Sequence, residues 1–238
     1  ILKNPEEINI AISRPPEKID QQAYVIYETQ KMPLVRHILK SVDYKSILIF
    51  CSKKQNVKNL ARDLKRAGFP AEQIHSDLEQ SEREDVLRGF ASRRIPILVA
   101  TDVLSRGIDI DQIELVINYD VPHDGEDYVH RIGRTARAAT SGTAVTFVTE
   151  KEQRKFSQIE QLLGKPVPKK EVPESLGPVP EYEPFRKGGH RPPEAPSAHG
   201  RSLGRPQGGS RSQGDRPKGE QRPGGHRTSD RKPGERPR

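Results

Sequence analysis

The segment HRIGRTAR at residues 130–137 combines residue types and a spacing that suit phosphate binding. If the segment is helical, His130, Arg134 and Arg137 are at positions i, i+4 and i+7 and share one face. A guanidinium stays charged at neutral pH, and its forked donors fit the oxygens of a phosphate. Gly133 weakens a helix interior by about 1 kcal/mol relative to Ala, which indicates close approach of another backbone or a ligand. The alternative is an ordinary solvated basic helix face.

Residues 99–109, VATDVLSRGID, form a second polar segment, which follows an apolar run. Ligands of open α/β sheets bind at the carboxyl ends of strands. At such a place Thr101 can donate its hydroxyl to a phosphate, Arg106 can pair with one, and Asp109 can accept a hydrogen bond from a ribose hydroxyl. Taken alone, the segment is also compatible with an ordinary capped turn.

Residues 75–83, HSDLEQSER, lead from a short predicted strand into a predicted helix. The first turn of a helix has free backbone N–H groups and the positive end of the helix dipole, which makes it an anion site. Gln80 and Arg83 flank this turn, so we predict that they contact phosphate. Each of them is also compatible with a solvated capping position.

Short runs rich in β-branched residues alternate with segments of helical period, which predicts an α/β fold: a parallel sheet with helices on both faces. The predicted strands are residues 46–50, 73–75, 95–100, 114–118 and 143–148, with less regular ones at 9–13 and 23–27. The predicted helices are residues 33–39, 56–67, 81–91, 127–137 and 152–163. This arrangement places two of the polar segments, 75–83 and 99–109, at the ends of strands.

The composition changes near residue 183. From there to residue 238 the chain has 14 Lys and Arg against 6 Asp and Glu, a net charge of +8 that equals the charge of the whole chain. This stretch also has 11 Gly and 9 Pro, and it has too little apolar surface to offset the entropy of ordering. We therefore divide the chain into a linker with edge strands (1–30), one folded domain (31–165) and a disordered basic tail (166–238).

The single cysteine, Cys51, excludes an internal disulfide and a Cys-based zinc site. We predict no metal ligands in this chain. No apolar run reaches transmembrane length and no signal-peptide pattern opens the chain, so we expect a cytoplasmic protein. The chain begins with Ile1 and not with Met, and we expect an upstream portion to precede it.

Four segments occur in an order typical of one helicase family. Residues 48–53 (LIFCSK) resemble motif IV, residues 80–83 the QxxR motif, residues 100–109 motif V, and residues 128–137 motif VI. Up to about residue 163 the chain resembles the C-terminal RecA-like lobe of DEAD-box ATP-dependent RNA helicases, more loosely their RhlE-type bacterial members. Ser76 departs from the pattern, since many members have Gly there, which puts one phosphate contact in doubt.

The resemblance implies a role for each matching residue. Arg134 and Arg137 match the arginine fingers that reach the γ-phosphate of ATP across the cleft between two lobes. Gly107 and Asp109 match the ATP-binding part of motif V. The other matches are with the RNA backbone groove, at Ser52, Gln80, Arg83, Thr101 and Arg106, and with coupling between the lobes, at Asp102 and His130.

Three motifs of complete helicases do not occur in the sequence: the GxxxxGK[ST] loop, the DEAD box and the SAT motif. The chain therefore supplies neither a phosphate cradle nor Mg²⁺ carboxylates. We predict that it hydrolyses no ATP by itself. With ATP, Mg²⁺ and an N-terminal RecA-like lobe it would unwind short RNA duplexes. The basic tail would tether RNA weakly and without sequence preference, or else only keep the protein in solution.

Two other functions fit parts of the sequence. The first is a lobe of another superfamily-two motor that translocates on DNA, but its motif VI would usually begin with Gln rather than with His130. The second is a non-catalytic RNA-binding or scaffold module, which would have no physical need for Arg134, Arg137 and Asp109. We therefore favour the RNA helicase lobe and keep both alternatives for testing.

Overall fold

Six parallel strands form a single sheet in the computed structural model, which describes residues 18–102, 113–135 and 142–185. The strand order is β1-β6-β5-β2-β4-β3, and every neighbouring pair is parallel. The predicted parallel sheet is therefore confirmed. The strands are β1 (Ile19–Ile26), β2 (Ile47–Phe50), β3 (Ala71–Ile74), β4 (Ile97–Ala100), β5 (Leu115–Asn118) and β6 (Gly142–Thr149).

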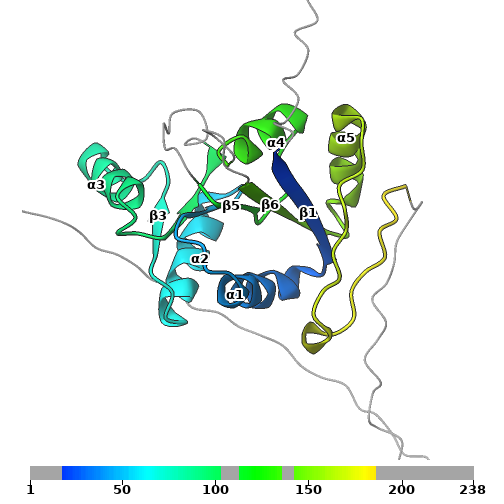
Figure 1. Cartoon of the computed structure of the whole chain (residues 1–238), viewed down its shortest axis with the longest axis horizontal. Coiled ribbons are helices and arrows are strands. Elements are labelled where there is room, and N and C mark those ends of the chain that lie inside the picture. The colour runs from blue at the N-terminus through cyan, green and yellow to red at the C-terminus, as the bar shows by residue number, and fades with distance from the viewer. Residues whose placement is uncertain (1–17, 103–112, 136–141, 186–238) are drawn as a thin grey trace, which may run out of the picture. The chain divides into compact units, whose positions relative to one another are not determined.

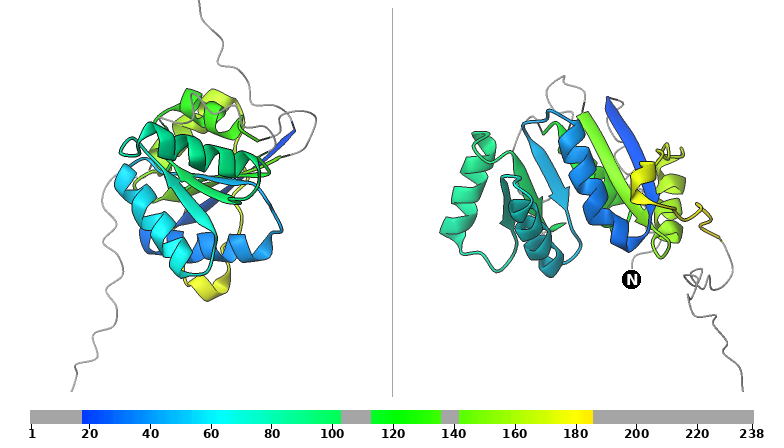
Figure 2. Two further views of the ribbon diagram at one scale, coloured as in Figure 1. Left: turned by 90° about the vertical axis from the view of Figure 1, so that its left-hand side faces the viewer. Right: turned by 90° about the horizontal axis from the view of Figure 1, so that it is seen from below.

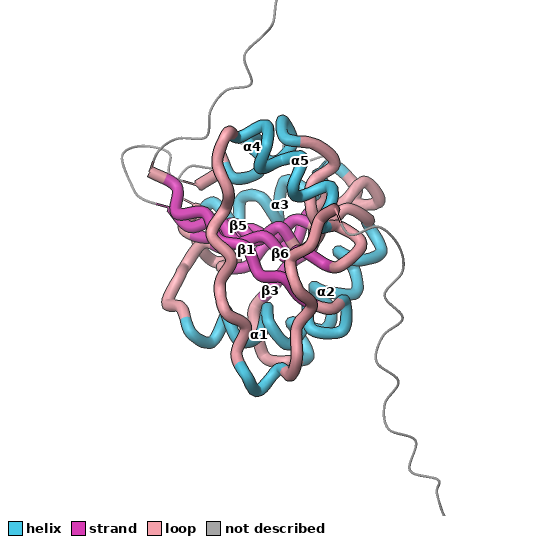
Figure 3. Tube along the Cα trace, turned by 90° about the vertical axis from the view of Figure 1, so that its right-hand side faces the viewer, coloured by secondary structure: helices cyan, strands magenta, loops and turns pink. Residues whose placement is uncertain are grey.

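Helices cover both faces of this sheet, as predicted. In Figure 3 the sheet lies between α1 and α2 below and α3, α4 and α5 above, and Figure 1 shows α1 and α2 together on one side. None of the described helices is long and apolar enough to cross a membrane. The helices are α1 (Lys31–Ser41), α2 (Lys54–Arg66), α3 (Gln80–Ala91), α4 (Gly125–Ile132) and α5 (Gln153–Leu163), with short 3-10 helices η1 (Glu28–Gln30) and η3 (Glu174–Leu176).

The central strands are short, continuous apolar runs because both of their faces are covered. All four residues of β2 are buried. Successive strand residues point to opposite faces, so Ile49 packs in the core with α1 and α2, whereas Leu48 packs in the core with Phe90 of α3. Gly68, just after α2, has a positive φ of 85°, a conformation that favours glycine.

Residues 165–185, which we call the strap, contradict the prediction of a disordered tail from residue 166. Ala23 of the edge strand β1 donates its N–H to Pro168 O at 2.9 Å, and Lys170 N–H donates back to Ala23 O at 2.8 Å. Gln30 Nε2 then donates to Leu176 O at 2.8 Å and to Pro178 O at 3.0 Å. These bonds satisfy backbone groups of a segment whose composition alone suggested disorder.

Two apolar anchors hold the strap on the α5 side of the molecule, at the opposite end from α3 (Figure 2). Val167 is buried against the α4 and α5 core, and the Tyr182 ring packs edge-on to Phe156 with centroids 6.4 Å apart. The Tyr182 hydroxyl donates to Glu160 Oε2 at 2.5 Å. The strap is therefore part of the folded unit. The strand predicted at residues 9–13 and the tail from residue 186 lie outside the described residues.

Candidate functional site

Three of the predicted polar residues lie where the parallel strands end. We call this end of the sheet the carboxyl edge. Since all strands are parallel, the residues that follow β2, β4 and β5 lie along one edge. Ser52 follows β2 and is exposed, whereas Thr101 and Asp102 follow β4 and are buried and half-buried. The structure thus brings three predicted residues from motifs IV and V to one edge.

Arg131 ties this edge together from the last turn of α4. Its side chain is fully buried, and Nε and Nη2 donate to the two carboxylate oxygens of Asp102 at 2.5 and 2.7 Å. Nη1 donates to the backbone oxygen of Asp120 at 3.0 Å and to Asn118 Oδ1 at 3.3 Å. The fork therefore clamps the ends of β4 and β5 to α4, and Asp102 has an intralobe partner that the sequence did not reveal.

A buried ion pair lies next to this clamp. Lys31 Nζ is 2.8 Å from Asp120 Oδ1, and the two residues are only 1% and 6% exposed. The other oxygen, Asp120 Oδ2, accepts the backbone N–H of Ser52 at 2.8 Å. Asp120 therefore contacts α1 through Lys31, the residue after β2 through Ser52, and α4 through its own carbonyl and Arg131. It is the hub of the edge.

Electrostatics keep both members of this pair charged. Burial lowers the pKa of Lys31, but attraction by Asp120 and then by Glu152 more than offsets this, and the pKa is raised overall. Burial likewise raises the pKa of Asp120, but Lys31 outweighs it and the pKa is lowered overall. Two ions this deeply buried are stable only as a well-formed, hydrogen-bonded pair.

The helix predicted at residues 127–137 ends at Ile132, so the prediction that Arg134 continues the polar face of this helix is wrong. Gly133 is the C-cap and donates its N–H to Val129 O at 2.8 Å. A Cβ on Gly133 would lie 2.9 Å from that same carbonyl oxygen. The last turn of the helix itself therefore accounts for the glycine, and no approaching ligand is needed to explain it.

Arg134 lies in a tight turn just beyond α4. Its N–H donates to Arg131 O at 3.2 Å, and the next residue, Thr135, is buried and donates its hydroxyl to Ile113 O at 2.6 Å. The backbone of Arg134 is therefore anchored on both sides, and its side chain is half-buried. Arg137, Arg106, Gly107 and Asp109 lie outside the described residues.

His130 of motif VI lies on the last turn of α4 and is half-buried. Its Nε2 is 4.0 Å from Glu126 Oε1, beyond hydrogen-bond distance. Its Nδ1 is buried and has no hydrogen-bond partner among the described residues. Its role in coupling between the lobes stays a prediction.

The start of α3 differs from the predicted anion site. Glu79 is the N-cap, and its side chain accepts the backbone N–H of Glu82, while the Glu82 side chain accepts from Glu79 N–H at 3.0 Å. Two carboxylates therefore satisfy the first turn, and their charge opposes a phosphate there. Gln80 is exposed and bonds Glu84 at 2.8 Å, whereas Arg83 has a buried Nε without an acceptor in the described part of the chain.

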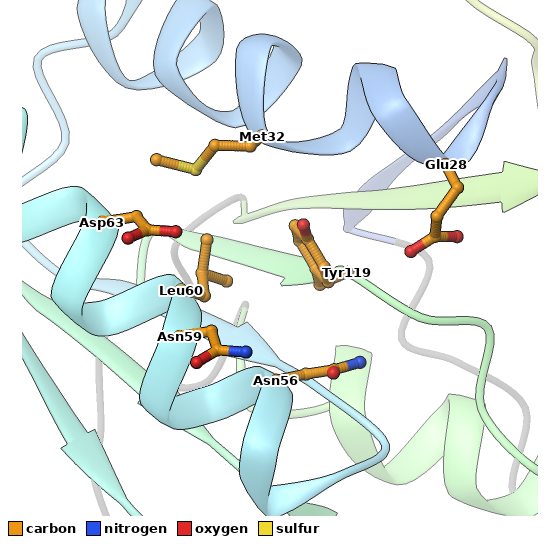
Figure 4. A pocket seen from close by; sticks show the side chains of 7 residues that line it. All are labelled: Glu28, Met32, Asn56, Asn59, Leu60, Asp63 and Tyr119. Carbon is orange, nitrogen blue, oxygen red and sulfur yellow. The ribbon is translucent and has the colours of Figure 1, made fainter.

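A pocket of about 150 Å³ lies between α1 and α2, and Figure 4 shows the side chains that line it. It is smaller than the roughly 300 Å³ at which small-molecule pockets usually begin. None of its lining residues is a predicted site residue, but the pocket adjoins the buried pair, since Asn56 Nδ2 donates to Asp120 Oδ2 at 3.4 Å and Glu28 Oε2 is 3.1 Å from Lys31 Nζ. The lining residues are Glu28, Met32, Asn56, Asn59, Leu60, Asp63 and Tyr119.

Sequence reasoning missed Arg131, Lys31 and Asp120. Lys31 and Asp120 are 89 residues apart, and nothing in a single sequence marks them as partners. Arg131 did carry a signal, since it lies three residues after the apolar Tyr128, and residues at i and i+3 share one face of a helix. A cation in that register has to be buried beside an acceptor.

Comparison with known proteins shows which class of protein has this fold. The helicase conserved C-terminal domain matches residues 30–139. The ATP-dependent RNA helicase DbpA of Bacillus subtilis is 40% identical over 173 residues, which cover 72% of this chain and 36% of DbpA. The probable ATP-dependent RNA helicase DDX47 of Homo sapiens is 40% identical over 170 residues, with 70% and 37% covered. The chain thus spans little more than a third of these relatives.

Solved structures with a similar fold belong to the DEAD-box proteins. The E. coli DEAD-box protein SrmB, bound to regulator of ribonuclease activity A, superposes with a TM-score of 0.64 at 30% identity over 69% of this chain and 96% of that one. S. cerevisiae Dbp5, bound to RNA and ADP BeF3, gives a TM-score of 0.62 at 30% identity over 65% and 42%. The chain belongs to the DEAD-box family, and its folded unit is the C-terminal helicase lobe.

Proposed function

We propose that this chain is the C-terminal half of an ATP-dependent RNA helicase, which closes with an N-terminal lobe on ATP and RNA and unwinds short RNA duplexes. The observation that carries the proposal is the buried network of Arg131, Asp102 and Asp120. It joins the turn of Arg134, proposed for ATP, to Ser52 and Thr101, proposed for RNA. A change in the contacts of ATP with this lobe would therefore affect the same group of residues that contacts RNA.

ATP would meet this lobe at Arg134 and Arg137, with Gly107 and Asp109 on the ribose side. The fixed backbone of Arg134 fits this role, because the turn holds the start of the side chain in one place. A finger of this kind stabilises the charge that spreads over the transferring phosphoryl oxygens and is worth roughly 10³ to 10⁵ in rate.

RNA would lie along Ser52, Gln80, Arg83, Thr101 and Arg106. Contacts of these side chains with phosphates give affinity and orientation and read no base sequence. Support comes from Arg83, whose buried Nε has no acceptor in the described residues, and from the RNA-bound state of Dbp5. The basic tail, residues 186–238, would add a weak, salt-sensitive contact.

Mg²⁺ would be held by the N-terminal lobe. The described residues contain no group of three or more His, Cys, Asp or Glu side chains placed to hold a metal ion. The sequence also has no DEAD box and no GxxxxGK[ST] loop. In this proposal the present chain supplies the arginines and half of the RNA groove, and the partner lobe supplies the phosphate cradle and the metal.

The proposal is tested with a fusion of the DbpA N-terminal lobe ahead of residue 1. RNA-stimulated ATP hydrolysis should fall at least about 10³-fold in Arg134→Ala. It should be unchanged in Arg154→Ala, since Arg154 is exposed on α5 and is none of the residues proposed for ATP or RNA. Equal rates in the two variants would favour the scaffold alternative, and equal stimulation by DNA and RNA would favour a DNA motor.

A further inference from the structure

Two lysines of α2 are both held by one carboxylate from another part of the chain. Lys54 Nζ is 2.9 Å from Asp77 Oδ1, and Lys58 Nζ is 2.8 Å from Asp77 Oδ2. Each oxygen of Asp77 thus has its own cation. We call these three residues the lysine clasp. None of them was among the residues assigned to a ligand above.

The clasp lies among the residues proposed to contact RNA. Lys54 begins α2, two residues after Ser52, and Asp77 follows β3, three residues before Gln80. In the sheet, β4 lies between β2 and β3, and its carboxyl end carries Thr101. The clasp therefore crosses from the β2 side to the β3 side of the proposed RNA groove, past the end of β4.

The backbone of Asp77 is held in place, whereas the ammonium groups of the two lysines are at the ends of long, solvent-exposed side chains. The backbone N–H of Asp77 donates to Nδ1 of the buried His75 at 3.2 Å, which anchors the loop to the end of β3. The lysine side chains are 59% and 39% exposed. Hydrogen bonds from Lys58 and Lys54 lower the pKa of Asp77 to about 2, so its carboxylate stays charged at any pH at which the protein is used.

A carboxylate and a phosphate compete for the same ammonium donors. Exposed ion pairs contribute little to stability and exchange readily with other partners. Two lysines beside a phosphate-binding groove are therefore placed to bind RNA, yet both are occupied by a charge of the same sign as the RNA. Nothing in the packing of the fold requires this, because all three side chains are at the surface.

We propose that Lys54 and Lys58 are additional phosphate ligands and that Asp77 is a built-in competitor that withholds them, which holds down the affinity of this lobe for RNA. The proposal rests on the RNA-binding function proposed above. RNA would enter the groove by exchanging a phosphate for Asp77. Replacing Asp77 by Asn keeps the shape and the His75 contact but releases both cations.

The test is the binding of a fluorescein-labelled oligouridylate to the full chain as a function of salt. Each released lysine that meets a phosphate adds about 0.7 to the salt slope for a single strand, so Asp77→Asn should steepen the slope by about 1.4. Its gain in affinity should accordingly shrink about sevenfold between 50 and 200 mM salt. The basic tail is the same in all proteins and contributes equally.

A second comparison distinguishes two explanations for tighter binding by Asp77→Asn: release of the two lysines, and loss of direct repulsion between Asp77 and RNA. In the Lys54→Gln/Lys58→Gln background, adding Asp77→Asn should bring no gain. A gain of the same size there would mean that Asp77 repels RNA directly, and the competitor role would be wrong. Asp85→Asn is the matched control, because Asp85 is exposed on α3 and pairs only locally with Arg88.

The outcomes also distinguish this proposal from the one it rests on. If the unaltered chain binds the oligouridylate and Asp77→Asn matches Asp85→Asn in affinity and slope, the clasp has no such role, while RNA binding stands. If neither the unaltered chain nor any variant binds, both proposals fall. Because the substitutions are at the surface, equal thermal unfolding of the unaltered chain and the four variants is the expected check that each is folded.

Discussion

Replacing Lys31 by Met removes the cation of the buried pair and leaves the rest of α1 intact. Met fills a similar volume, so the main effect is on Asp120, whose carboxylate stays 6% exposed without its charge partner. Breaking a buried pair in this way costs about 3 to 5 kcal/mol. We expect the lower end, about 3 kcal/mol, because Asp120 keeps the N–H of Ser52.

The assay is urea unfolding followed by circular dichroism, since the chain has no Trp. With a slope of about 2 kcal/mol/M, a loss of 3 kcal/mol lowers the midpoint by about 1.5 M. Lys40→Met, on the exposed face at the end of α1, is the control and should shift the midpoint by less than about 0.3 M. Equal midpoints for the two variants would refute the account of the edge.

The Lys31–Asp120 pair also limits the pH range over which it stabilises the fold. The pKa of Asp120 is lowered in the fold, so its contribution is present above its unfolded pKa, roughly 4, and is lost as pH falls through the lower folded value. The pKa of Lys31 is raised, so its contribution is present below roughly 10 and is lost as pH rises through the higher folded value. Full stabilisation therefore lies between these limits.

Three more predictions concern Arg131, the strap and the basic tail. Arg131→Lys keeps the charge but loses the fork that bonds Asp102 and Asn118, and it should lower the free energy of unfolding by about 3 kcal/mol in the same assay, whereas Arg154→Lys should change nothing. Truncation after residue 163 removes the strap and should lower Tm by roughly 5 to 10 °C, since the burial of Val167 and Tyr182 is lost. Truncation after residue 185 should leave Tm unchanged and flatten the salt dependence of RNA binding. An unaltered Tm without the strap would contradict its assignment to the folded unit.

The sheet was predictable from the sequence because its central strands are continuous apolar runs. The predicted strand at 46–50 contains the observed β2, and the one at 95–100 contains β4. Because both faces of these strands are buried, few other placements of such apolar runs are possible. The alternating pattern also predicted correctly that Thr101, in the segment 99–109, lies at the end of a strand. Local pattern and global topology agree in this part of the chain.

The errors arose where local pattern gave way to tertiary contacts. Gly133 was interpreted as a helix interior residue, but it is the C-cap of α4, and this shifted the expected face of Arg134. The strap looked disordered by composition because its order depends on Gln30 and Gln153, distant side chains that bond its backbone. The Lys31–Asp120 pair is a contact between distant residues and left no local signal.

The central claim is that this chain completes an ATP site that it cannot form alone. The most direct measurement is ATP hydrolysis with and without RNA for three samples: the chain alone, the DbpA N-terminal lobe alone, and their fusion. We predict no turnover by the chain alone and RNA-stimulated turnover by the fusion that exceeds the activity of either part. Robust hydrolysis by the chain alone, or a fusion no more active than the N-terminal lobe, would contradict the account.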